Sequence, residues 1–131
     1  MYLIDTNIWL ERLLEQRKSD EVALMLNNVP GYEMLISDFS FHSIGVIMTK
    51  LNKKEDFLDF ITDIFNNAKV NSISLIPSDM HSLVSAMNKY KFDFDDAYQY
   101  ICVKKYDLKL VSFDKDFNKT DIKIYKPSDI I

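Results

Sequence analysis

The sequence has few of the residues that specify tight turns, kinks or covalent cross-links. Its 131 residues include two glycines, three prolines and one cysteine. So few glycines and prolines argue against a loop-rich β protein and favour helices joined by short connections. The lone Cys102 cannot form an internal disulfide, which fits a reducing compartment. No basic-then-apolar leader opens the chain, and no apolar run is long enough to span a bilayer. We therefore expect a cytoplasmic protein with no membrane partner.

The sequence also lacks an excess of positive charge. It carries 16 Lys and Arg against 20 Asp and Glu, a formal net charge of -4. No overall positive field would attract duplex nucleic acid, although an enzyme needs only a local basic groove. The two histidines have no Cys or His partner at zinc-like spacing. Gly31 and Gly45 form neither a phosphate-binding loop nor a nucleophile elbow.

Apolar residues are abundant and follow a regular order. The chain is 47% hydrophobic and 13% aromatic, enough for a sizeable core. Runs of strand-forming residues alternate with helical periodicity. We expect strands near residues 2–4, 34–36, 73–76 and 110–113, with a half-exposed edge strand near 122–124. Helices are expected near residues 6–16, 19–28, 39–51, 53–65, from 78 onward, and 93–106. In the helix from 78 onward, Met80, Leu83, Val84 and Met87 are expected to face inward. This alternation predicts one α/β domain over residues 1–131, with a mainly parallel sheet of four or five strands.

Three acidic residues occupy positions where such a fold places ligands. Asp5 ends the first predicted strand, Asp114 ends the fourth, and Asp96 lies in the first turn of the last helix. The ends of parallel strands meet at one edge of a sheet, where α/β folds bind ligands. Clustered carboxylates repel one another until a proton or a hard cation relieves the repulsion. Mg²⁺ and Mn²⁺ prefer oxygen ligands and can activate water at a phosphodiester.

Each acid also has a purely structural interpretation. Asp5 can cap the helix that follows it, and Asp96 lies three residues after Asp93, as in a capping box. Asp114 can belong to a surface turn with Asp116. Taken singly, each structural interpretation is the stronger one. The common placement of all three acids after strands or at a helix start favours a functional site.

Three motifs carry a resemblance that spans essentially the whole chain. They are Leu3-Ile4-Asp5-Thr6-Asn7, Phe94-Asp95-Asp96-Ala97 and the run from Leu110 through Ser112-Phe113-Asp114-Lys115-Asp116 to Phe117. Together they resemble the PIN-domain family of metal-dependent nucleases, and in particular the VapC-type toxins of toxin–antitoxin pairs. The resemblance implies a three-layer α/β/α sandwich and a Mg²⁺- or Mn²⁺-dependent endoribonuclease. It would cleave single-stranded RNA by metal-activated water, leaving a 3′-hydroxyl and a 5′-phosphate. An antitoxin partner and a homodimer are also implied.

The resemblance also implies roles for individual residues. Asp5, Asp96 and Asp114 would be the catalytic residues and hold the metal directly or through water. Asp116 would help them, and Thr6 or Ser112 would steady a carboxylate or a water by hydrogen bonding. Nine of the sixteen basic residues lie beyond residue 88, which gives faint support for an RNA groove. The candidates nearest the acids in sequence are Lys115 and Lys119.

The chain departs from the family pattern at one acidic position. Family members usually carry a Glu in the helix after the second strand, and that position falls on Ser43. A serine is neutral, so metal affinity and activity are expected to fall, unless Asp38, His42 or Glu11 compensates. The alternative function is therefore a weakly active or non-catalytic PIN-like module that binds RNA or a protein.

Overall fold

A five-stranded parallel sheet forms the centre of the protein in the computed structural model, which describes residues 1–130. Its strand order is β3-β2-β1-β4-β5, and every neighbouring pair is parallel. The strands are short, and they span Tyr2–Ile4 (β1), Met34–Ser37 (β2), Asn71–Ile73 (β3), Lys109–Val111 (β4) and Ile124–Tyr125 (β5). The predicted mainly parallel α/β fold is confirmed.

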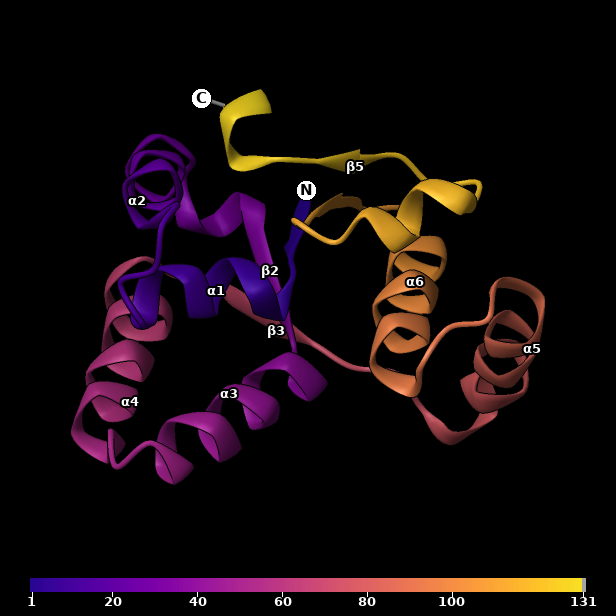
Figure 1. The fold of residues 1–131 in the computed structure, drawn as a ribbon, viewed down its shortest axis with the longest axis horizontal. Helices are drawn as coiled ribbons and strands as arrows, with labels where there is room; N and C mark the ends of the chain where they lie inside the picture. The colour runs from indigo at the N-terminus through magenta and orange to yellow at the C-terminus, as the bar shows by residue number, and fades with distance from the viewer. Residues whose placement is uncertain (131) are drawn as a thin grey trace.

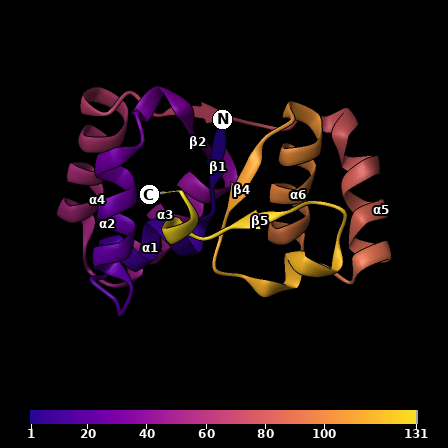
Figure 2. The same ribbon diagram turned by 90° about the horizontal axis from the view of Figure 1, so that it is seen from above.

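In the described part of the chain, six α-helices cover the two faces of the sheet (Figure 1). Seen from above, α1, α2, α3 and α4 lie on one side of the strands, and α5 and α6 lie on the other (Figure 2). The arrangement is the predicted three-layer sandwich. The helices span Thr6–Leu13 (α1), Ser19–Asn28 (α2), Asp38–Lys50 (α3), Lys54–Ile61 (α4), Met80–Tyr90 (α5) and Phe94–Tyr106 (α6).

The strands divide their side chains between two hydrophobic cores because successive residues of a strand point to opposite faces. Ile4 and Val111 pack with Trp9 and the inner side chains of α1 to α4. Leu3 and Leu110 pack on the other face with the inner side chains of α5 and α6. Burial on both faces explains why these strands read as continuous apolar runs.

The register of the two central strands sets the position of the residues that follow them. Ile4 of β1 is paired with Val111 of β4, and the Asp5 amide donates to the Val111 carbonyl at 2.9 Å. Asp5 and Ser112 therefore leave the sheet side by side at its carboxyl edge.

Several predicted boundaries were wrong for identifiable reasons. β3 ends at Ile73, although the apolar residue Leu75 was predicted to belong to this strand. The backbone amide of Leu75 donates to the Tyr98 hydroxyl at 2.9 Å instead of to a neighbouring strand. The first helix stops at Leu13, before Glu15 with its φ of 49°. The predicted helix over 53–65 changes after Ile61 to a π-helical turn over Thr62–Asn67. Val84, expected to face inward, is 50% exposed.

Candidate metal and nuclease site

Asp5 is the buried centre of the site. It is 7% exposed and occupies the N-cap position of α1, where its Oδ1 accepts the Thr6 amide at 2.9 Å. Its Oδ2 accepts the Ser112 hydroxyl at 2.7 Å, and Oδ1 also accepts the Gln99 side-chain amide at 3.0 Å. Burial raises the pKa of Asp5, and these three donors oppose that effect. The helix-capping interpretation of Asp5 is thus correct without excluding a functional one.

Asn7 and Ser112 join the helix after β1 to the loop after β4. The Asn7 side-chain amide donates to the Ser112 hydroxyl oxygen at 3.3 Å, and its oxygen accepts the Phe113 amide at 3.3 Å. The same Ser112 oxygen accepts the Asp114 amide at 3.0 Å. Ser112 is fully buried. These bonds hold the start of the Asp114 loop against Asp5.

Three further carboxylates converge beside Asp5. Asp96, Asp114 and Asp116 each place one oxygen within 4.8 Å of the others. Asp114 also accepts the Asp116 amide at 2.9 Å, so the predicted surface turn and the acid cluster are the same structure. Asp5 lines the same pocket as Asp96 and Asp114, but its carboxylate does not belong to the group whose oxygens lie within 4.8 Å of one another. Asp96, Asp114 and Asp116 therefore form a group of carboxylate oxygens beside the buried Asp5, and Asp96 also belongs to a second such group with Asp93 and Asp95 at the start of α6.

This arrangement disfavours the ionised form of the Asp96 carboxyl. Asp96 lies in the first turn of α6 and is half-buried. The capping box expected with Asp93 is not formed, because the Asp93 side chain makes no capping bond. Partial burial first, and then the charges of Asp114 and Asp95, raise the pKa of Asp96 to about 7. Within residues 1–130, no lysine or arginine forms an ion pair with Asp96 or Asp114.

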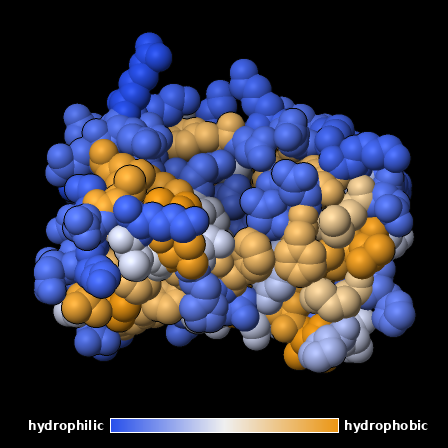
Figure 3. All heavy atoms as spheres, turned by 60° about the horizontal axis from the view of Figure 1, so that its bottom comes forward, coloured by the Kyte–Doolittle hydropathy of each residue, from blue (hydrophilic) through white to orange (hydrophobic). Residues whose placement is uncertain are grey.

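The acids open into a cavity of about 230 Å³ at the carboxyl edge of the sheet. Figure 3 brings this side of the molecule forward and shows a hollow with a hydrophilic floor between apolar side chains. The cavity is lined by Asp5, Thr6, Asn7, Leu10, Phe39, Asp95, Asp96, Gln99 and Asp114. A cavity of this size has room for a small hydrated cation.

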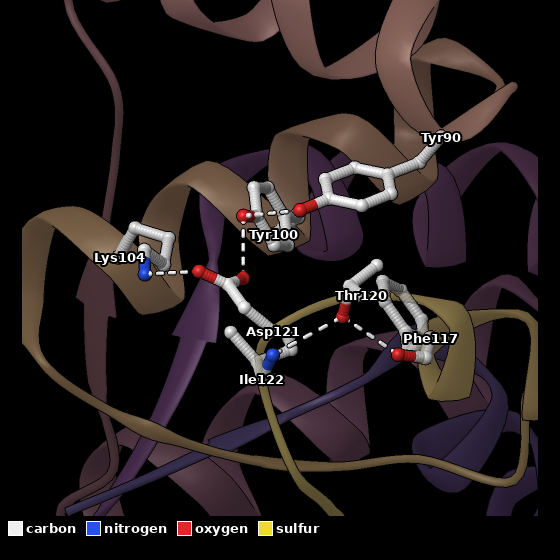
Figure 4. Close-up of polar contacts among 7 residues, drawn as sticks. All are labelled: Tyr90, Tyr100, Lys104, Phe117, Thr120, Asp121 and Ile122. Atoms are coloured by element: carbon white, nitrogen blue, oxygen red, sulfur yellow. Dashed lines mark hydrogen bonds and ion pairs between the residues drawn. The ribbon is translucent and has the colours of Figure 1, made fainter.

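The loop that carries Asp114 and Asp116 is anchored on its far side to α6. Phe117 is fully buried, with its ring centroid 5.4 Å from that of Phe92. Figure 4 shows the following segment, in which Asp121 accepts the Tyr100 hydroxyl at 2.6 Å and meets Lys104 at 2.7 Å. These contacts fix the C-terminal end of the acid-bearing loop, and the bonds of Asn7 and Ser112 fix its start, so the cluster does not depend on a free turn.

Ser43 lies next to the acid cavity rather than in it. It follows Phe39 by one turn of α3 and lines a neighbouring groove of about 400 Å³ with Asp38 and His42. Phe39 borders both hollows. None of the proposed substitutes lines the acid cavity. Asp38 accepts the Tyr98 hydroxyl at 2.7 Å, His42 is exposed, and Glu11 accepts the Lys18 amide at 2.7 Å.

Five residues of the cavity were not predicted as site residues, namely Asn7, Leu10, Phe39, Asp95 and Gln99. Gln99 is 2% exposed and is polar within an otherwise apolar or aromatic buried stretch of α6, from Ala97 to Val103. It follows Asp96 by three residues, which places both on one helix face. That spacing was a usable signal. Phe39 could not have been identified, because its position depends on how α3 meets α6.

The donor set fits a hard divalent cation. The cluster offers carboxylate oxygens alone, which Mg²⁺ and Mn²⁺ prefer over nitrogen or sulfur ligands. Burial, and then the charges of Asp114 and Asp95, raise the pKa of Asp96, and a bound cation would oppose both effects. Thiol chemistry is not favoured, because burial raises the pKa of Cys102 to about 12.

An α/β sandwich with an acid cluster at the carboxyl edge of its sheet is the structural class that fold and site define. The sequence matches the PIN domain family over residues 2–123. The chain therefore belongs to the PIN domain family. A search of curated proteins gave no significant match.

Solved structures with the same fold cover almost the whole chain. A toxin–antitoxin complex from Klebsiella pneumoniae is 20% identical, with a TM-score of 0.75, over 97% of this chain and 98% of its own. VapC20 from Mycobacterium tuberculosis, a sarcin–ricin-loop-cleaving toxin, is 11% identical with a TM-score of 0.81, over 97% and 100%. FitAcB from Neisseria gonorrhoeae is 17% identical with a TM-score of 0.71, over 98% and 99%. At these identities the likeness concerns the fold.

No helix within residues 1–130 combines the length and the apolar character that crossing a bilayer requires.

Proposed function

We propose that the protein is a divalent-metal-dependent endoribonuclease and the toxin of a toxin–antitoxin pair. The observation that carries this proposal is the convergence of Asp96, Asp114 and Asp116 beside the buried Asp5 at one end of the sheet. Membership of the PIN domain family and the toxin neighbours named above support it. The single domain expected over residues 1–131 accords with the extent of the family match.

Each acid has a role that follows from its position. Asp96 and Asp114 face the cavity and would bind a cation directly, with Asp116 as a third oxygen donor. Asp5, whose two oxygens already accept three hydrogen bonds, would act from behind through its charge or through a water. A bound Mg²⁺ or Mn²⁺ would supply Lewis acidity, lowering the pKa of water and neutralising charge on the phosphoryl oxygens.

The RNA would approach over the exposed loop that follows β4. Lys115 is exposed and immediately follows Asp114. Lys119 is also exposed, with its ammonium 5.2 Å from the centroid of the Phe92 ring. Lys104 and Lys105 are already paired with Asp121 and Asp79. We therefore assign phosphate contacts to Lys115 and Lys119, with a single-stranded RNA as substrate.

The decisive experiment is cleavage of a labelled single-stranded RNA in the presence of Mn²⁺. We expect cleavage that stops on chelation and is lost in Asp96→Asn, with a fall of 10²-fold or more in rate. Asp56→Asn is the matched control, because Asp56 is an exposed acid on α4 whose nearest cation is Lys53 at 3.9 Å. Cleavage that survives Asp96→Asn or ignores the chelator would refute the proposal.

The second candidate function is a non-catalytic module that binds RNA or a protein. The observation that favours it is the neutral Ser43 at the position where the family usually has a Glu. It predicts RNA retention without cleavage even at high Mn²⁺.

The antitoxin partner and the homodimer are separate parts of the proposal. The neighbour from Klebsiella pneumoniae was solved as a toxin–antitoxin complex, which supports a protein partner here. Co-expression with the product of an adjacent small reading frame should yield a stable complex that suppresses cleavage. Light scattering on the isolated chain should give twice the 15.4 kDa chain mass, and a monomer mass would contradict the dimer.

A further inference from the structure

We propose that Gln99 is the positioning residue of the acid site, holding the Asp5 carboxylate in the orientation that metal binding requires. The inference rests on the proposed function and deepens it. It starts from the fact that Gln99 is a buried neutral amide among carboxylates, 2% exposed, and lines the acid cavity.

Every side-chain group of Gln99 has a partner. Its Nε2 donates to Asp5 Oδ1 at 3.0 Å and to Ser40 Oγ at 3.1 Å. Its Oε1 accepts the Ser37 hydroxyl at 2.7 Å. The opposite orientation of the amide would place its oxygen against the Asp5 carboxylate, where both atoms are acceptors. The network therefore selects the orientation in which Gln99 donates to Asp5.

The partners of Gln99 connect three elements that meet only in the folded chain. Ser37 caps α3 through a bond from the Ser40 amide at 3.0 Å, and the Thr6 hydroxyl donates to Ser40 Oγ at 2.7 Å. Gln99 thus bridges the start of α3, the start of α1 and the face of α6 that carries Asp96. A shift of α6 would move the Asp5 donor and the Asp96 ligand together.

An amide suits this position better than a carboxylate or an apolar group would. A carboxylate at 3.0 Å from Asp5 would add like charge to a buried site. An apolar side chain would leave the Asp5 oxygen with one donor fewer and would remove the nearer of the two acceptors of the Ser37 hydroxyl, leaving only Ser40 Oγ at 3.1 Å. Residues that donate hydrogen bonds to the carboxylates of a metal site orient those carboxylates, and loss of such a donor typically lowers metal affinity about 10- to 100-fold.

The test compares Gln99→Met with Tyr98→Phe. Met keeps the length of the side chain and removes its donors. Tyr98→Phe removes two hydrogen bonds of the neighbouring α6 residue and leaves the bonds of Asp5 intact. In the wild type, the Tyr98 hydroxyl donates to Asp38 at 2.7 Å and accepts the Leu75 amide at 2.9 Å. Calorimetry with Mn²⁺ should show a Kd raised about tenfold or more in Gln99→Met and changed less than twofold in Tyr98→Phe. Equal effects in the two variants would overturn the proposal.

A metal-free measurement separates this proposal from the proposed function. The Asp5 carboxyl carbon is followed by ¹³C NMR in the wild type and in both variants. Its resonance should move in Gln99→Met and stay in Tyr98→Phe. If the wild type binds no Mn²⁺, the metal-dependent function fails while this resonance still decides the role of Gln99. An unmoved Asp5 resonance in folded Gln99→Met overturns the positioning role.

Discussion

Replacing Asp96 with Asn should stabilise the folded protein, although it destroys the proposed metal site. The carboxyl of Asp96 has a pKa near 7 instead of 3.8, because it is partly buried and faces Asp114 and Asp95. In a rigid site that excludes water, a pKa raised by this amount would disfavour the ionised Asp96 carboxylate by up to ~4 kcal/mol. Asp96 is half-buried, so solvent screening reduces the expected gain to about 1–2 kcal/mol.

The gain in folding stability from Asp96→Asn must increase as the pH rises. The folded-state pKa lies above the unfolded value, so between these values the folded wild type binds more protons than the unfolded chain. Its stability therefore falls as pH rises from about 4 to about 7. The difference between variant and wild type should be near zero at pH 4 and reach its full size by pH 8. For a chain of this length, we expect a rise in Tm of about 3–8 °C at pH 8.

Thermal unfolding across this pH range, in chelator, checks the prediction. Adding Mn²⁺ should reverse the order of stability, because a cation that binds only the folded wild type stabilises it by mass action. Asp56→Asn, the exposed α4 control, should show neither effect. A variant at Asp96 that is less stable than the wild type at pH 8, or a gain independent of pH, would refute the account of charge repulsion.

Three further substitutions probe the surroundings of the site. Ser43→Glu adds a carboxylate one turn beyond Phe39, which borders the acid cavity, and should tighten Mn²⁺ binding about tenfold; unchanged calorimetry would show that Ser43 is too far from the metal. Gly31→Ala should destabilise the protein by ~2 kcal/mol or more, because a Cβ there would lie 1.6 Å from the Ala68 carbonyl oxygen; an unchanged urea midpoint would contradict this close packing. Phe117→Ala removes a fully buried ring and should cost about 3–5 kcal/mol by urea unfolding, with weaker Mn²⁺ binding because Phe117 anchors the loop of Asp114; intact binding in the folded variant would show that the loop is held elsewhere.

Much of the site could be predicted from the sequence, because the local residue pattern and the parallel topology place the acids at the same edge of the sheet. An apolar run that ends in Asp predicts a buried strand with its acid at the sheet edge, and this holds for Asp5 whatever the rest of the chain does. The alternation of strands and helices makes the sheet parallel, so Asp5 and Asp114 lie at the same edge. Asp96 joins them because α6 starts at that edge.

The errors came where a tertiary contact outweighed a local preference. Leu75 was predicted in a strand, yet its amide is bound by Tyr98 from α6. Val84 matched the apolar periodicity of α5 but lies on its exposed side. Asp93 is the N-cap residue of α6, as predicted, but its side chain makes no capping bond and lies in an acidic group with Asp95 and Asp96. Each outcome depends on a neighbour distant in sequence or on how a helix is rotated.

The sequence by itself determined the order of elements, the two-sided burial of the central strands and the delivery of acids to one edge of the sheet. These follow from periodicity and from residues that end strands or begin helices, which act within a few positions of one another. Only the tertiary structure decided that the oxygens of Asp96, Asp114 and Asp116 lie within 4.8 Å of one another, that Asp5 lies outside this group, and that Gln99 donates to Asp5. Such relations depend on the packing of α6 against the ends of β1 and β4, across 94 residues between Gln99 and Asp5. Distances between side chains set by packing cannot be inferred from spacing along the chain.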